Sequence, residues 1–170
     1  TLSEGGKLGI DGDVGISLGP AGTGKLSGSY SNDGTFALGG EVQLAIPGLA
    51  EVTARISYAN QEISGEAEVP IDKAVLPGLD GALKVHFYEN RWSGEATLAY
   101  TADKGKLSGA VAVTVTQTDA GVLQLGGEGM VRARLMPRLE GMLTARILPE
   151  GGVDISGAID VTYVGPNPAI

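Results

Sequence analysis

Apolar and polar residues alternate strictly over long stretches of this chain. From Leu8 to Leu18 every second residue is apolar or glycine, and the residues between them are polar or glycine. The same alternation returns from Leu38 to Ile46 and from Leu107 to Val115. A period of two predicts half-buried β-strands, and no stretch has the 3.6-residue spacing of an amphipathic helix. The pattern therefore predicts an all-β fold.

Short connections separate these stretches, which predicts antiparallel neighbours in an up-and-down meander. We expect ten or eleven long strands, at about residues 7–18, 25–31, 35–46, 51–59, 62–70, 81–89, 91–101, 105–117, 121–135, 140–148 and 153–164. Strands of about ten residues span about 33 Å, which is long for a compact sandwich. We therefore predict one domain over residues 1–170, built as an elongated, twisted sheet that curls into a roll or barrel.

A unit of about 30 residues recurs along the chain. Each unit has a proline-containing turn, an outgoing strand, a polar tip and a return strand, and units begin at Pro47, Pro77 and Pro137. The return strands share a step of a large apolar residue, serine and glycine: Leu26-Ser27-Gly28, Ile63-Ser64-Gly65, Trp92-Ser93-Gly94, Leu107-Ser108-Gly109 and Ile155-Ser156-Gly157. A glycine inside a strand marks a bend, a bulge or a close approach. We interpret these glycines as packing sites on the concave apolar face, covered by large neighbours such as Trp92 or Phe87, rather than as a ligand groove.

The alternation also predicts the core, because a one-residue slip would move the whole set to the solvated face. The expected apolar face consists of Leu8, Ile10, Val14, Ile16, Leu38, Val42, Leu44, Val52, Ile56, Ile63, Val69, Leu83, Val85, Phe87, Leu98, Val111, Val113, Val131, Ile147, Ile155, Ile159 and Val161. The expected solvated face includes Thr53, Glu66, Lys84 and Asp160.

Charge and amino-acid composition limit the classes of function that this chain can have. Twenty acidic and 12 basic residues give a net charge of −8, which disfavours broad contact with nucleic acid or an anionic membrane. The chain has no cysteine, so disulfides and thiolate metal sites are excluded. No stretch reaches the roughly 20 apolar residues of a transmembrane helix. The sequence begins at Thr1 without a signal-like segment, and we interpret it as part of a longer polypeptide.

Two short motifs are similar to ligand loops. Gly19-Pro20-Ala21-Gly22-Thr23-Gly24-Lys25 matches the start of a Walker A loop, but Leu26 stands where a magnesium-binding Ser or Thr would follow and no helix pattern comes after it. We interpret it as a hairpin turn. Asp11-Gly12-Asp13 supplies too few ligands for a calcium loop. His86, the single histidine, is predicted to be a solvated strand residue.

Acidic side chains raise one catalytic alternative. Glu66, Glu68 and Glu95 lie on neighbouring polar faces, with Asp160 further along, and paired carboxylates can perform glycosidic acid–base chemistry. Such a site needs an aromatic-lined cleft, whereas aromatic residues are only 5% of the chain, so we interpret the row as a solubilising surface. The serines of the Ser-Gly steps lack the strand–elbow–helix setting of a nucleophile. The sequence thus predicts no catalytic residue, no cofactor-binding residue and no metal ligand, and the protein is expected not to be an enzyme.

The cadence of PGL, a strand, and then SGEAEV or SGEATL resembles repetitive β regions of large bacterial proteins that carry the core domain of extracellular contractile injection systems. These systems are phage-tail-like particles that deliver proteins into other cells. The matching stretches are Pro47–Val69, Pro77–Leu98 and Pro137–Val161. No peptidase-like motif of that family occurs. The resemblance implies a structural, cargo-associated or toxin-associated segment of a much longer secreted or injected chain.

Three functions stay open. The first is a non-enzymatic structural or interaction module, extracellular or particle-associated with the cytoplasm still possible, whose partners are other parts of its parent protein or particle, or a second copy through the sheet edges. Neither nucleic acid nor membrane insertion is favoured. The second is an outer-membrane-type or lipid-binding β-barrel, because alternating strands of this length with Tyr and Trp near their ends are typical of that class. The third is an enzyme, kept as the formal alternative.

Overall fold

Strands dominate the fold. The computed structural model describes residues 2–3, 7–31, 34, 36–49, 51–59, 62–136, 139–157 and 162–163. Within these ranges there is one antiparallel sheet and no α-helix, only two single-turn 3₁₀ segments at Gly19–Ala21 (η1) and Asp103–Gly105 (η2). The described part of the chain holds no helix of the length and apolarity that crossing a membrane requires.

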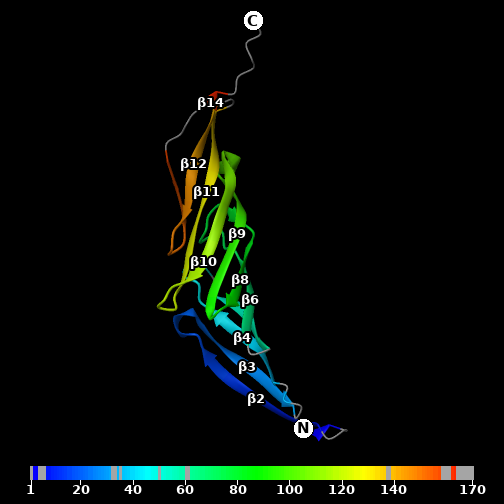
Figure 1. The fold of residues 1–170 in the computed structure, drawn as a ribbon. Coiled ribbons are helices and arrows are strands. Elements are labelled where there is room, and N and C mark those ends of the chain that lie inside the picture. The colour runs from blue at the N-terminus through cyan, green and yellow to red at the C-terminus, as the bar shows by residue number, and fades with distance from the viewer. Residues whose placement is uncertain are drawn as a thin grey trace.

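The strands follow one another in chain order from β1 to β13, except that β7 pairs with β9, and β14 pairs with β12 (Figure 1). Their bounds are β1 Leu2–Ser3, β2 Lys7–Ser17, β3 Gly22–Ser31, β4 Phe36–Leu44, β5 Val52–Ala59, β6 Glu62–Pro70, β7 Leu79–Asp80, β8 Ala82–Tyr88, β9 Arg91–Ala102, β10 Leu107–Gln117, β11 Leu123–Met136, β12 Leu139–Ile147, β13 Val153–Ser156 and β14 Thr162–Tyr163.

The predicted meander is confirmed, and most predicted strand ends lie within three residues of the observed ones. The last predicted strand, 153–164, is wrong as a continuous element. β13 ends at Ser156, residues 158–161 lie outside the described residues, and β14 pairs with the far end of β12. The short strands β1 and β7 were not predicted, because two residues are too few to show a period of two.

The sheet is elongated and strongly staggered (Figure 1). A row of directly opposite residues runs through seven strands, from Val14, the eighth residue of β2, to Trp92, the second residue of β9. β2 and β9 run in the same direction, so the row slips by about half the length of a strand. The sheet curls as it slips and brings distant turns together. A Cβ built on Gly121 would lie 3.5 Å from Pro20 Cδ, and one on Gly48 would lie 2.9 Å from Gly151 Cα.

The core lies inside this curl. Its buried side chains extend from Ala21 and Leu44 through Trp92 to Leu123 and Ile147 as one cluster, and no polar or charged residue is buried among the described residues. Thirteen of the predicted core residues are buried, namely Val42, Leu44, Val52, Ile56, Val69, Leu83, Val85, Phe87, Leu98, Val111, Val113, Val131 and Ile147. The register predicted from the alternation is therefore confirmed in the middle of the sheet, where Thr53, Glu66 and Lys84 are exposed as expected.

The core prediction is wrong at Val14 and Ile63, whose exposed fractions are 57% and 45%. Both side chains occupy the predicted face, but the sheet extends past the curl there and none of the described residues buries them. Ile16, Leu38 and Ile155 are half-buried. The side chains of Leu8, Ile10, Ile159 and Val161 lie outside the described residues, as does Asp160.

The glycines of the Ser-Gly steps allow the strands to approach closely where the sheet curls. A Cβ on Gly94 would overlap the carbonyl oxygen of Lys84, and one on Gly109 would overlap that of Met130. A Cβ on Gly65 would lie 3.0 Å from Trp92 Cη2, which confirms that Trp92 covers this site. The prediction is wrong at Gly157, which is exposed, has φ of +128° and has Thr144 N, 3.7 Å away, as its nearest neighbour.

Candidate functional site

The polar face of the sheet carries ordered rows of charge. One row of directly opposite residues runs Lys25, Glu41, Arg55, Glu66 and His86 across strands β3 to β8. Opposite charges on facing strands attract and like charges repel. The alternation of sign along this row therefore favours the observed register.

A second row lies two residues further along the strands. In it Glu68 of β6 lies directly opposite Lys84 of β8, and Glu95 of β9 lies directly opposite Thr114 of β10. Glu68 therefore faces a cation, and the same Lys84 lines a hollow together with Glu95. The fold thus brings together the carboxylates that the sequence singled out, but in an arrangement that suits surface solvation better than a paired acid and base.

Shallow hollows lie between these rows. One of them has a volume of about 760 Å³ and is lined by Glu41, Arg55, Glu66 and His86 together with Ile56 and Phe87. Two neighbouring hollows, of about 480 and 520 Å³, also include His86 and Lys84. All three are open to solvent, unlike the enclosed clefts that bury most of a small ligand. No group of three potential metal ligands from His, Cys, Asp and Glu occurs in the described ranges.

The two loop-like motifs take strand and turn conformations. Gly19, Pro20 and Ala21 form the 3₁₀ turn η1 between β2 and β3, and Gly22 to Lys25 begin β3. No helix follows to present its N-terminus to a phosphate, which is the setting that a Walker A loop needs. Asp11 and Asp13 belong to strand β2, and Asp13 is exposed to solvent.

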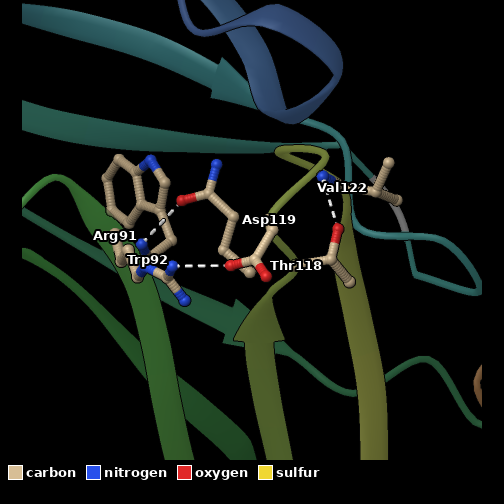
Figure 2. A network of polar contacts seen from close by, with 6 residues as sticks. Arg91, Trp92, Thr118, Asp119 and Val122 are labelled. Atoms are coloured by element: carbon tan, nitrogen blue, oxygen red, sulfur yellow. Dashed lines mark hydrogen bonds and ion pairs between the residues drawn. The ribbon is translucent and has the colours of Figure 1, made fainter.

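The single tryptophan anchors a polar network at one end of the core (Figure 2). Trp92 N donates to Gln117 Oε1 at 3.0 Å, and Gln117 Nε2 donates to Gly121 O at 3.1 Å. Beside them Arg91 Nη2 pairs with Asp119 Oδ1 at 2.7 Å, and Val122 N donates to Thr118 Oγ1 at 3.2 Å. These bonds fix the 118–122 turn against the start of β9, so the network has a structural role.

The indole of Trp92 is 1% exposed, and its Nε1 has no acceptor in the described part of the protein. The ring packs against Phe87 with 5.1 Å between centroids. A buried donor without a partner typically costs about 1–3 kcal/mol. The stabilisation from the apolar packing of this ring therefore exceeds the cost of leaving its N–H without a hydrogen bond.

Two side chains have displaced pKa values. The Lys73 ammonium donates to Asp80 Oδ2 at 2.9 Å and lowers the pKa of that carboxyl, in an ion pair whose side chains are mostly exposed. Burial raises the pKa of the Tyr100 phenol above its ordinary value of 10.0. Neither group lies in the hollows around His86, so these shifts do not indicate an acid–base site.

Exposed apolar side chains form two patches that the sequence reasoning missed. The N-terminal patch consists of Val14, Tyr30, Phe36 and Ile63, and the methionine patch consists of Met130, Leu135, Met136 and Met142. Met130 and Met142 occupy polar-face positions on β11 and β12, where the alternation calls for a hydrophilic residue. That break in the pattern is the sequence signal that could have located the second patch.

Comparison with known proteins adds no family. The chain matches no protein-family model, no curated protein and no solved structure.

Proposed function

We propose that this chain is a non-enzymatic structural and interaction module of a large secreted or injected bacterial protein, associated with a contractile injection system or a toxin. The observation that carries the proposal is the separation of the two faces. Most of the apolar face is enclosed by the curl, and every described charged side chain is at least partly exposed to solvent, several of them in a row of alternating sign. A sheet of this kind offers stable surfaces rather than an enclosed reaction site.

The repeat supports the parent-protein part of the proposal. Gly48 and Gly78 occupy the same position in two PGL turns and have φ of +81° and +86°. Proline followed by a glycine with positive φ is typical of a type II turn. The sequence cadence that resembles the injection-system proteins therefore corresponds to a repeated backbone conformation.

The enclosed apolar face also favours this function over a membrane barrel, in which the apolar face would point outward to lipid. The exposed Lys84, Glu66 and Thr53 lie on the outward face instead. We keep the barrel as the alternative that the experiment must be able to reveal.

Native mass spectrometry and detergent-free purification test the proposal together. We expect the chain to purify from a bacterial lysate without detergent and to show the mass of the unliganded polypeptide, 17.2 kDa per copy. A small molecule bound at one-to-one occupancy would contradict the module function. A requirement for detergent or lipid to keep the chain dispersed would support the barrel.

The parent-protein part has its own test. We expect the chain, fused to a fluorescent protein, to sediment with purified injection particles. The same fluorescent protein fused only to the hairpin Val52–Pro70 serves as the control, because this hairpin lacks the curl. Equal sedimentation of the two fusions, or none, would contradict the association.

A further inference from the structure

All three methionines of the chain are exposed to solvent. The exposed fractions are 53% for Met130, 65% for Met136 and 41% for Met142, and the core cluster of the described residues contains none of them. Methionine is among the residue types that are most often fully buried. Because every thioether of this chain lies at the surface instead, each sulfur is open to small reagents in solution.

Two of these methionines break the alternation of the strands that carry them. On the polar face of β11, Met130 lies between the charged residues Glu128 and Arg132, and β12 places Met142 on the same face. Oxidation of a thioether to a sulfoxide converts an apolar side chain into a polar one. The oxidised residues would therefore fit the pattern that the reduced residues break.

Each of the two faces a hydrogen-bond donor on the neighbouring strand. Met142 lies directly opposite Arg132, and Met130 lies directly opposite Thr144. Side chains in such positions have Cβ atoms about 4.5–5.5 Å apart, so a long methionine side chain can reach its partner. A thioether sulfur is only a weak acceptor for these donors, whereas a sulfoxide presents a polar oxygen to them. Met136 differs, because it lies opposite Leu139, which has no side-chain donor.

The Arg132 guanidinium is free to turn toward a new acceptor. Its Nε lies 3.7 Å from Glu140 Oε2, which is beyond hydrogen-bond distance, and its side chain is 59% exposed. Arg134 approaches the same carboxylate more closely, with 3.4 Å between Nε and Oε1. Within the described part of the protein, Arg132 can therefore bind an oxygen on Met142 without giving up a side-chain hydrogen bond.

We propose that Met130 and Met142 form a reversible oxidation site, in which peroxide converts both thioethers into sulfoxides that accept hydrogen bonds from Thr144 and Arg132. The sulfur lone pair attacks one oxygen of hydrogen peroxide, and the O–O bond breaks. The proton on the transferred oxygen passes to the departing hydroxide, which leaves as water. The sulfur thus loses two electrons and the peroxide gains them. Methionine sulfoxide reductases restore the thioether. The site does not depend on the proposed module function.

Peptide mass spectrometry after treatment with hydrogen peroxide tests the access to each sulfur, because every sulfoxide adds about 16 Da. In the folded chain, Met130 and Met142 should oxidise at rates within a few-fold of those in the same chain unfolded in urea. Leu83→Met is the control, because Leu83 is fully buried and the two side chains have similar volumes. Its added sulfur should oxidise far more slowly in the folded chain than in urea. Strong protection of Met130 or Met142 would overturn the proposal.

Urea midpoints before and after oxidation test whether the fold accommodates the products. The midpoint of the wild type should not fall, because no sulfoxide enters the core. The midpoint of Leu83→Met should fall when its added sulfur is oxidised, because a polar group then lies among buried apolar side chains. A wild-type midpoint that falls as far as that of Leu83→Met would overturn the proposal.

The role of Arg132 has its own test. A chain with Met130→Leu and Met136→Leu keeps Met142 as its single sulfur, and oxidation of this chain gives a reference shift of the urea midpoint. Adding Arg132→Leu should make the shift more negative, because the sulfoxide then loses its donor. Arg134→Leu is the matched control, since Arg134 pairs with the same Glu140 but faces that carboxylate rather than a methionine. Equal shifts in the two arginine variants would overturn the role of Arg132.

Enzymatic reduction of the folded, oxidised wild type tests reversibility. The two methionine sulfoxide reductases, one for each sulfoxide epimer, are supplied with dithiothreitol as the reductant. We expect the mass to return to that of the untreated chain. A synthetic peptide of residues 128–145 that carries the same sulfoxides is the control. Reduction of the peptide without reduction of the folded chain would overturn the reversible site.

Discussion

At the scale of single residues, Gly94 shows how missing side chains permit the curl. A Cβ there would overlap the Lys84 carbonyl oxygen and lie 3.0 Å from Val85 Cα. The alternation placed this glycine on the apolar face, but it could not identify the obstructing atom as backbone rather than as a side chain. Backbone in a paired strand cannot rotate away as a side chain can, so the space is fixed.

Replacing Gly94 with valine should destabilise the protein by about 1–3 kcal/mol, because the added atoms force the neighbouring strand to shift. The loss should occur despite valine's better strand propensity. Gly15→Val is the matched control, because a Cβ on Gly15 meets nothing within 4 Å and removal of a strand glycine relieves an entropic cost. Urea midpoints followed by Trp92 fluorescence compare the two. Equal midpoints would contradict the close-approach explanation.

A substitution in the turn between β8 and β9 should increase the stability of the protein. Glu89 and Asn90 have φ of +49° and +62° and join strands whose last pair is Tyr88 with Arg91, as in a two-residue type I′ hairpin. Asparagine tolerates this conformation better than glutamate does. Glu89→Asn should therefore stabilise the protein by about 0.5–1 kcal/mol. A thermal melt checks this expectation, and a lowered midpoint would show that the Glu89 side chain has another role.

At the scale of elements, the long strands were predictable because each of them repeats its own signal over seven to fourteen residues. The same reasoning failed where pairing is brief. Leu79 is fully buried and pairs with Tyr100 through β7, yet the sequence shows only a proline-containing turn there. The two exposed apolar patches were not predicted for another reason. The alternation assigns a side chain to a face but does not say whether another part of the chain covers that face.

Tyr100 links this small element to alkaline stability. Its raised pKa means that the folded state holds the phenol proton more tightly than the unfolded state does, so the contribution is present below about pH 10 and is lost as pH rises through the folded-state pKa. Tyr100→Phe should remove part of the loss of stability between neutral pH and about pH 11. Urea midpoints at several pH values measure it, with the exposed Tyr88→Phe as control. Parallel pH profiles for Tyr100→Phe and the wild type would contradict this role.

At the scale of the whole molecule, the stagger determines the shape that the sequence could only describe as a roll or barrel. The row from Val14 to Trp92 slips by about half the length of a strand, so the curled sheet is drawn out along the strands. Local patterning specifies each strand, whereas this offset is the sum of small register choices made at every turn. The total offset can be seen only when all the strand pairings are considered together.

The stagger has a mechanical consequence. β1 and β14 lie at opposite ends of the fold (Figure 1), so tension applied there is directed along β2 and loads its nine paired residues with β3 in parallel. Force applied between the start of β2 and the end of β3 would instead open the same pairs one at a time.

The absence of cysteine allows thiol handles to be placed at will. Optical-tweezers pulling between positions 7 and 163 should therefore require several-fold more force to rupture the fold than pulling between positions 7 and 31. Similar forces in the two geometries would show that the chain yields elsewhere first. A molecule built this way resists tension along its long axis and unfolds at low force when the ends of β2 and β3 are pulled apart.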